Sequence, residues 1–174
     1  MRIALALAAS LALAGAAHAA APAPASAAAK PPPSKPEQTV VVGPTGKSIV
    51  VTPALLAALD RAEATMIDHG KPHTYEGVRL TELLRLVDAP TGARIHASAD
   101  RDYLVVTGGD GFRAVYSLAE TDRSVQKRPV ILADKMDGAP LIAHDAPYRL
   151  VVDGDQKPAR SVYAVARIEV KVLP

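Results

Sequence analysis

The sequence has 174 residues, of which 49% are hydrophobic, 22% are charged and 3% are aromatic, and it contains no cysteine. This length allows one domain and a tail, and the lack of cysteine excludes thiol nucleophiles, thiolate metal sites and redox pairs from this chain. The formal net charge is +2 and residues 38–174 hold 17 basic and 17 acidic side chains, so neither nucleic-acid binding nor electrostatic attachment to a membrane surface is indicated.

The first 19 residues have the pattern of a secretory signal peptide. Arg2 supplies the positive charge, IALALAASLALAGA is an apolar run too short for a comfortable membrane span, and Ala17-His18-Ala19 is an A-x-A cleavage site. We therefore predict cleavage after Ala19, a periplasmic location reached by the Sec route, and no membrane insertion after cleavage.

Residues 20–37 are rich in alanine and proline, with the sequence AAPAPASAAAKPPPSKPE. Such a segment buries too little apolar surface to offset the entropy of ordering it. We predict a disordered linker over 20–37, which leaves 38–174 as a single domain large enough for one hydrophobic core.

The first half of this domain predicts two strands, a helix, two more strands and a second helix. The β-branched runs 39–42 and 48–52 predict a strand pair, and Thr52-Pro53 predicts the start of a helix over 53–62. Strands are predicted at 64–68 and 74–78, with the loop HGKPH at 69–73 between them. Leucines at helical spacing from Leu80 predict a helix that ends before Pro90.

The second half predicts more strands than helices. Strands 102–108 and 112–117 flank Gly-Gly-Asp-Gly, where glycines suit a tight hairpin and Asp110 accepts the hydrogen bonds of the turn. A capping box at 117–120 predicts a short helix. Further strands are expected at 130–133, 148–152 and 161–173. The predicted fold class is α+β, with mixed or antiparallel sheets and a few short helices.

Four segments in this order resemble the molybdopterin-binding domain of the sulfite oxidase superfamily. They are YEGVRLTELL (75–84), DYLVVTGGDGFRAVYSLAE (102–120), VILADKMDGAPL (130–141) and APYRLVVDGDQKPARSVYAVARIEV (146–170). The resemblance covers roughly residues 38–171. It implies the mixed-sheet fold of that domain and a molybdenum ion held by a pterin dithiolene and one protein cysteine.

The chain departs from the resembled family in three places. Asp68 lies about where the resemblance places the metal-binding cysteine, and soft metal centres favour thiolate over carboxylate. Tyr163 stands where the family usually has a lysine that reaches the pterin. Family enzymes that receive their cofactor in the cytoplasm leave by the twin-arginine route, whereas this N-terminus has the single Arg2. These departures favour a retained fold without the cofactor's redox chemistry.

We predict that a pocket persists where the pterin binds in the resembled family. The candidate binding residues lie in the 68–73 segment and in two later segments, namely Asp68, His69, His73, Arg149, Arg160, Ser161 and Tyr163. The predicted occupant is a small anion, a pterin-like ligand or a segment of a periplasmic partner protein. No catalytic residue is predicted, because no serine has the G-x-S-x-G setting of a nucleophile.

The preferred functional hypothesis is an exported, non-catalytic binding or accessory module. The first alternative is a molybdopterin-dependent oxidoreductase in which Asp68 is an atypical metal ligand. The second is a periplasmic zinc or copper binder that uses Asp68, His69 and His73, assisted by His144-Asp145 if the loops converge. The sequence leaves open which cofactor, if any, is bound, which ligand and partner are recognised, and the oligomeric state.

Overall fold

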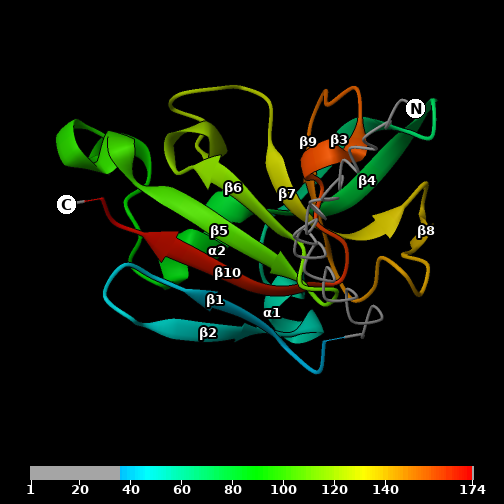
Figure 1. Ribbon diagram of the computed structural model, residues 1–174, viewed down its shortest axis with the longest axis horizontal. Helices are drawn as coiled ribbons and strands as arrows, with labels where there is room; N and C mark the ends of the chain where they lie inside the picture. Colours follow the sequence, from blue (N-terminus) through cyan, green and yellow to red (C-terminus); the bar gives the residue numbers. More distant parts are fainter. Residues whose placement is uncertain (1–35, 174) are drawn as a thin grey trace, which may run out of the picture.

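Two sheets of five strands each form the framework of the computed structural model, which describes residues 36–173 (Figure 1). The predicted signal peptide, residues 1–19, and most of the predicted linker lie outside the described residues. Within 36–173, no helix is both long and apolar enough to span a membrane.

The first sheet is mixed. Its strands are ordered β2 (Ser48–Val51), β1 (Thr39–Val42), β10 (Val165–Lys171), β5 (Tyr103–Gly108) and β6 (Arg113–Ser117). β1 and β10 run parallel, and the other neighbours are antiparallel. Strands from both ends of the domain therefore lie side by side at the centre of this sheet.

The second sheet is antiparallel. It consists of β3 (Arg61–Asp68), β4 (Lys71–Arg79), β7 (Val130–Met136), β8 (Ala139–Pro140) and β9 (Arg149–Val152), with β8 and β9 both paired to β7. The end of β3, the start of β4 and the start of β9 contribute to the candidate site described below.

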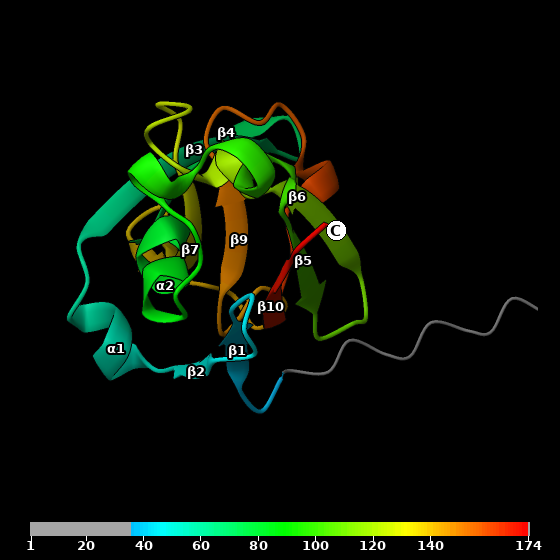
Figure 2. The same cartoon turned by 90° about the vertical axis from the view of Figure 1, so that its left-hand side faces the viewer.

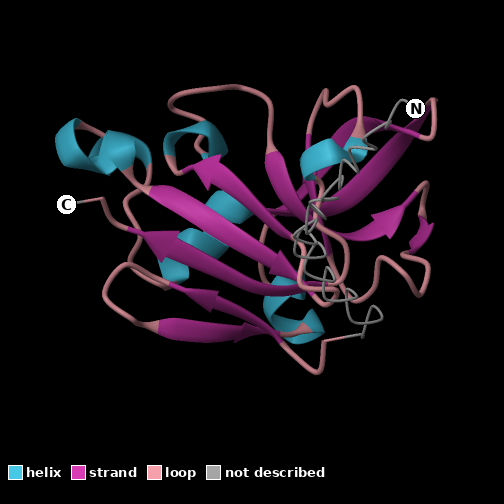
Figure 3. Ribbon diagram, in the orientation of Figure 1, coloured by secondary structure: helices cyan, strands magenta, loops and turns pink. Residues whose placement is uncertain are grey.

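Helices are short (Figure 3). The α-helices are α1 (Pro53–Ala57) and α2 (Leu80–Leu86), and the 3-10 turns are η1 (Gly92–Arg94), η2 (Ala97–Arg101), η3 (Ala119–Thr121) and η4 (Pro158–Arg160). The Thr52 side chain accepts a hydrogen bond from the Leu55 N–H at 3.1 Å and caps α1 as its sequence predicts. The predicted α+β class with mixed and antiparallel sheets is confirmed.

One hydrophobic core contains side chains of both sheets and of α2, which lies beside β7 (Figure 2). It includes Leu83 and Leu84 of α2, Ile168 of the first sheet and Leu132 of the second, all with no exposed surface. Each such side chain contributes about 1.5–3 kcal/mol when it is fully buried. The alternation of β7 turns Ile131 to the opposite face, where a smaller cluster with Tyr75 and Met66 forms.

Several predicted boundaries are wrong because long-range strand pairing overrides local propensity. The helix expected over 53–62 ends at Ala57, and Arg61 already pairs with Val78 as part of β3. The loop expected over 69–73 is a two-residue turn, His69-Gly70, with positive φ at both residues, and β4 begins at Lys71. This tighter turn places Asp68 opposite Lys71 and His73 opposite Met66.

Two other expected elements are shorter than predicted. At 117–120 the Ser117 N–H donates to Glu120 Oε1 at 2.9 Å, which is half of a capping box, but only the 3-10 turn η3 follows. The strand expected from 161 begins at Val165, because Ala164 has a φ of 43° and leaves the extended conformation.

The turn between β5 and β6 has the structural role predicted for it. Asp110 Oδ1 accepts a hydrogen bond from the Phe112 N–H at 2.8 Å, and Gly111 has a φ of 77° that favours glycine. The Gly-Gly-Asp-Gly segment therefore connects two antiparallel strands.

Candidate functional site

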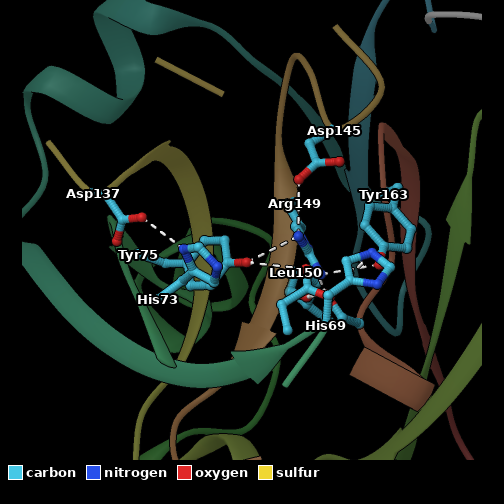
Figure 4. A network of polar contacts seen from close by, with 10 residues as sticks. His69, His73, Tyr75, Asp137, Asp145, Arg149, Leu150 and Tyr163 are labelled. Atoms are coloured by element: carbon cyan, nitrogen blue, oxygen red, sulfur yellow. Dashed lines mark hydrogen bonds and ion pairs between the residues drawn. The ribbon is translucent and has the colours of Figure 1, made fainter. Parts of the chain in front are cut away.

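Arg149, the first residue of β9, is the centre of the candidate site and is only 1% exposed. A guanidinium has five N–H donors and no acceptor. Each donor of Arg149 meets a side-chain oxygen: Nε meets Ser161 Oγ (2.9 Å), Nη1 meets Tyr75 Oη and Asp145 Oδ2 (both 2.9 Å), and Nη2 meets Tyr163 Oη (3.1 Å) and Asp68 Oδ2 (2.9 Å). Four of these contacts are hydrogen bonds and the fifth, to Asp68, is an ion pair, so every nitrogen of Arg149 is engaged by side chains of the domain (Figure 4).

The two carboxylates that bind Arg149 come from segments that are far apart in the sequence. Asp68 ends β3 and is 7% exposed, whereas Asp145 lies in the loop before β9 and is 2% exposed. The Asp145 backbone carbonyl also accepts from the Ala164 N–H at 3.1 Å, so the loop is tied to the segment that carries Tyr163. Two negative charges thus share one buried positive charge.

One carboxylate oxygen of this cluster lacks a partner. Asp68 Oδ2 meets Arg149 and accepts a long hydrogen bond from Tyr75 Oη at 3.4 Å. Asp68 Oδ1 is buried, has no hydrogen-bond partner among the described residues, and lies 3.8 Å from Nε2 of His69, beyond hydrogen-bond range. A buried acceptor left in this state is uncommon in folded proteins.

Aromatic rings complete the surroundings of Arg149. The guanidinium carbon lies 4.1 Å from the centre of the Tyr163 ring and 5.1 Å from that of Tyr75, within cation–π range of both. The imidazole of His144 packs against the Tyr163 ring, and the centroids of the two rings are 4.8 Å apart. The Tyr163 ring therefore contacts both His144 and Arg149.

Burial and the ion pairs set the protonation of this cluster. Burial alone would raise the pKa of Asp68, but the hydrogen bond and charge of Arg149 outweigh it and hold the pKa below its usual value. Burial would lower the pKa of Arg149, yet the surrounding tyrosine and carboxylate oxygens raise it. Burial raises the pKa of Tyr75 and of Tyr163, so both hydroxyls stay protonated at neutral pH.

A cavity of about 200 Å³ opens beside the cluster. Five of the seven predicted binding residues line it: Asp68, His69, His73, Arg149 and Tyr163. Its other walls are Met136, Ile142, His144 and Asp145. A larger cavity of about 460 Å³ beside α1 is lined by Arg61 and Asp134, whose ion pair is partly exposed. The buried ion pairs of Arg149 lie at the smaller cavity, which is therefore the candidate site.

Two predicted residues do not line this cavity. Ser161 lies behind Arg149, where its hydroxyl accepts from Nε and donates to the Leu150 carbonyl at 2.7 Å. Arg160 lies at the end of η4 and pairs with Asp155 at 2.9 Å and Glu120 at 3.0 Å. The structure thus directs Arg160 away from the other candidates.

The histidines do not form the predicted metal site. His69 occupies the β3–β4 turn with its side chain 96% exposed, whereas His73 Nδ1 is engaged by Asp137 Oδ2 at 2.6 Å. Within residues 36–173, no three His, Cys, Asp or Glu side chains are grouped in a way that could hold a metal ion.

Tyr75 is a site residue that the sequence reasoning missed. It sits in β4, is fully buried and joins Arg149 to Asp68 through its hydroxyl. The local signal was a lone tyrosine in YEGVRL, a position that reads equally well as hydrophobic core. Only the pairing of β4 with β3, and of β7 with both β4 and β9, brings its hydroxyl to Arg149.

The chain belongs to the oxidoreductase molybdopterin binding domain family, whose sequence model matches residues 62–172. Its fold is also similar to that of the sulfane dehydrogenase SoxCD from Paracoccus pantotrophus, with a TM-score of 0.58 at 20% sequence identity. The match covers 78% of this chain but only 39% of the other, and at this identity it shows a shared fold. No curated protein matches the chain. The predicted resemblance to the sulfite oxidase type of molybdopterin domain is confirmed.

Proposed function

We propose that this member of the molybdopterin-binding domain family is an exported, non-catalytic binding module that holds no molybdenum. One observation carries the proposal: Asp68, at the position where the resemblance places the metal-binding cysteine, is bound to a fully saturated Arg149. The polar side chains of the cluster therefore bind one another.

The donor set around the cavity does not fit a molybdenum–pterin group. The chain has no cysteine, so it supplies no thiolate, and the carboxylate oxygens of Asp68 are ligands that a soft metal centre disfavours. Transferring Asp68 Oδ2 from Arg149 to a metal ion would leave the buried guanidinium with fewer counter-charges. Removal of one partner from a buried ion pair costs about 3–5 kcal/mol.

The space and the charge beside Arg149 also argue against a pterin or another anion. The cavity of about 200 Å³ is smaller than the roughly 300–1,000 Å³ of pockets that enclose drug-sized ligands. Arg149 cannot clamp a phosphate or pterin edge, because all five of its N–H groups are engaged. Of the predicted occupants, a protein segment fits better than a small anion or a pterin-like ligand.

Export is the second part of the proposal. It is supported by the sequence of residues 1–19, with Arg2, an apolar run and the Ala17-His18-Ala19 cleavage pattern. A Sec substrate crosses the membrane unfolded and would reach the periplasm without a cofactor inserted in the cytoplasm. Export by this route and a site without a cofactor are therefore mutually consistent.

Metal and pterin analysis tests the proposed function. The chain with its own N-terminus is expressed in a host that makes the molybdenum cofactor, purified from the periplasm, and analysed for molybdenum by mass spectrometry and for pterin by fluorescence. We expect neither, whereas a family enzyme with a cysteine ligand, produced in parallel, should contain both. One molybdenum and one pterin per chain would overturn the proposal and favour the oxidoreductase with Asp68 as a metal ligand.

A further inference from the structure

We propose that the cavity beside Asp68 binds the primary ammonium group of a small alkylamine. This inference rests on the proposed function, because it names the chemical class of ligand that the binding module would take. Four features of the cavity carry it: its charge, its unpartnered acceptor, the orientation of His73 and its apolar walls.

The buried charges beside the cavity do not balance. Asp68 and Asp145 are both less than a tenth exposed and share the single positive charge of Arg149. With both carboxylates ionised, this cluster has one negative charge in excess. Because a buried charge without a counter-charge is costly, the cavity favours a cation over a neutral molecule or an anion.

An acceptor at the cavity wall is unoccupied. Asp68 Oδ1 is one of two buried side-chain oxygens among the described residues that have no partner, and the other, on Asp102, is not part of this cavity. Oδ1 is buried, takes no part in the Arg149 ion pair and lies 3.8 Å from Nε2 of the exposed His69. A ligand N–H that reaches Oδ1 would satisfy it.

His73 offers a second acceptor. Its Nδ1 lies 2.6 Å from Asp137 Oδ2, and the other oxygen of Asp137 accepts from the Thr74 N–H at 2.9 Å. This fixed carboxylate favours a proton on Nδ1, so the neutral imidazole has an acceptor at Nε2. Asp68 Oδ1 and Nε2 of the neutral His73 are therefore two acceptors beside the cavity, and an ammonium group offers three donors and no acceptor.

The remaining walls select for a short alkyl chain. Met136 and Ile142 are apolar, and Ile142 is 59% exposed, as expected of a residue at the mouth. A volume of about 200 Å³ accommodates a few methylene groups. The Tyr163 ring is already contacted by Arg149 and His144, so no free aromatic cage exists there for a quaternary ammonium, which also lacks N–H donors.

The test is a titration of the isotope-labelled full chain, followed by the backbone amide signals in NMR spectra. Four probes are used at equal ionic strength: n-butylammonium, n-butanol, butyrate and tetramethylammonium. We expect saturable shifts at residues 68–73 and 142–145 with n-butylammonium, and binding at least about tenfold weaker for the other three, because a hydrogen bond to a charged group is worth about one factor of ten or more. Equal affinity for n-butanol would overturn the inference.

Two variants and a matched control locate the site. Asp68→Asn keeps the shape of the side chain but removes its charge, and should weaken n-butylammonium binding roughly tenfold. Glu63→Gln makes the same charge change on the exposed face of β3 and should leave binding unchanged. Because Asp68→Asn also loosens Arg149, Ile142→Trp is the second variant: it narrows the mouth without touching the cluster and should also weaken binding. Equal binding by Ile142→Trp and the unaltered chain would contradict the assignment.

The result is separable from that of the cofactor analysis. Absence of n-butylammonium binding in a chain free of molybdenum and pterin would overturn the ligand class and leave the non-catalytic module standing. Tight binding of Zn²⁺ that shifts the signals of the same residues, without saturable binding of n-butylammonium, would overturn the amine as ligand. The cavity would then be assigned to a metal ion. Molybdenum in the purified chain would overturn the proposed function itself.

Discussion

Replacing Arg149 with alanine is expected to lower the free energy of unfolding by about 3–5 kcal/mol, the usual cost of breaking a buried ion pair from one side. The change leaves Asp68 and Asp145 buried without their counter-charge and removes the donors that satisfy Ser161 and two tyrosine hydroxyls. Urea denaturation followed by circular dichroism measures the effect. Because this loss is a large share of the stability of a small domain, the variant should be partly unfolded at 37 °C.

The matched control is Arg167→Ala, which removes an exposed arginine that pairs with Glu169 at 3.5 Å. A surface ion pair contributes about 0–1 kcal/mol, so this variant should unfold close to the unaltered chain. Arg149→Lys should recover only part of the loss, since an ammonium has three donors where the guanidinium has five. A change below about 1 kcal/mol for Arg149→Ala would mean that Arg149 is not the organising residue of the site.

Replacing Gly77 with alanine is expected to cost about 3 kcal/mol, the upper end of the range for overpacking a buried position. Gly77 lies in β4 at the point where its pairing with β7 shifts register. A Cβ there would lie 2.1 Å from the Leu132 carbonyl oxygen and 2.6 Å from the Ala133 Cα. Both are backbone atoms of a central strand, so the clash can be relieved only by separating β4 from β7.

Thr74→Ala, on the same strand but at an exposed side chain, serves as the control and should change stability by less than about 0.5 kcal/mol. The free energy of unfolding of both variants is obtained from the same urea series. Near-equal stability of the two would show that β4 can shift away from β7 at no cost. The close approach of backbone at Gly77 also explains physically why the YEGVRL segment has a glycine in the middle of a strand.

The sequence was most informative where local chemistry determines structure. The Asp110 turn, the Thr52 cap and the apolar spacing of α2 all follow from short-range rules and are confirmed. The order of four segments identified the family and fold. Boundaries failed where β pairing decides them, as at His69-Gly70, where a turn shorter than expected extends both strands.

In the candidate site too, some features follow from the sequence and others depend on long-range contacts. A resemblance placed Asp68, Arg149 and Tyr163 in one pocket, and the structure brings them together. No local pattern indicates that the donors of Arg149 are saturated, because Asp68, Tyr75 and Asp145 reach it from three separate segments. Arg160 adjoins the Arg149 partner Ser161 in sequence, yet η4 turns its side chain toward Asp155 and Glu120.

In the proposed module, Arg149 forms a structural cluster with its own neighbours and is not available to an anionic ligand. The most direct measurement is the NMR signal of the Arg149 Nε–H, assigned by its absence in Arg149→Lys and followed after transfer to D₂O, with and without molybdate. We expect a signal that outlasts those of exposed arginines and does not move with molybdate, because Nε donates to a buried Ser161 hydroxyl. Rapid exchange, or a saturable shift on addition of molybdate, would show that the guanidinium is open to anions and would contradict the account.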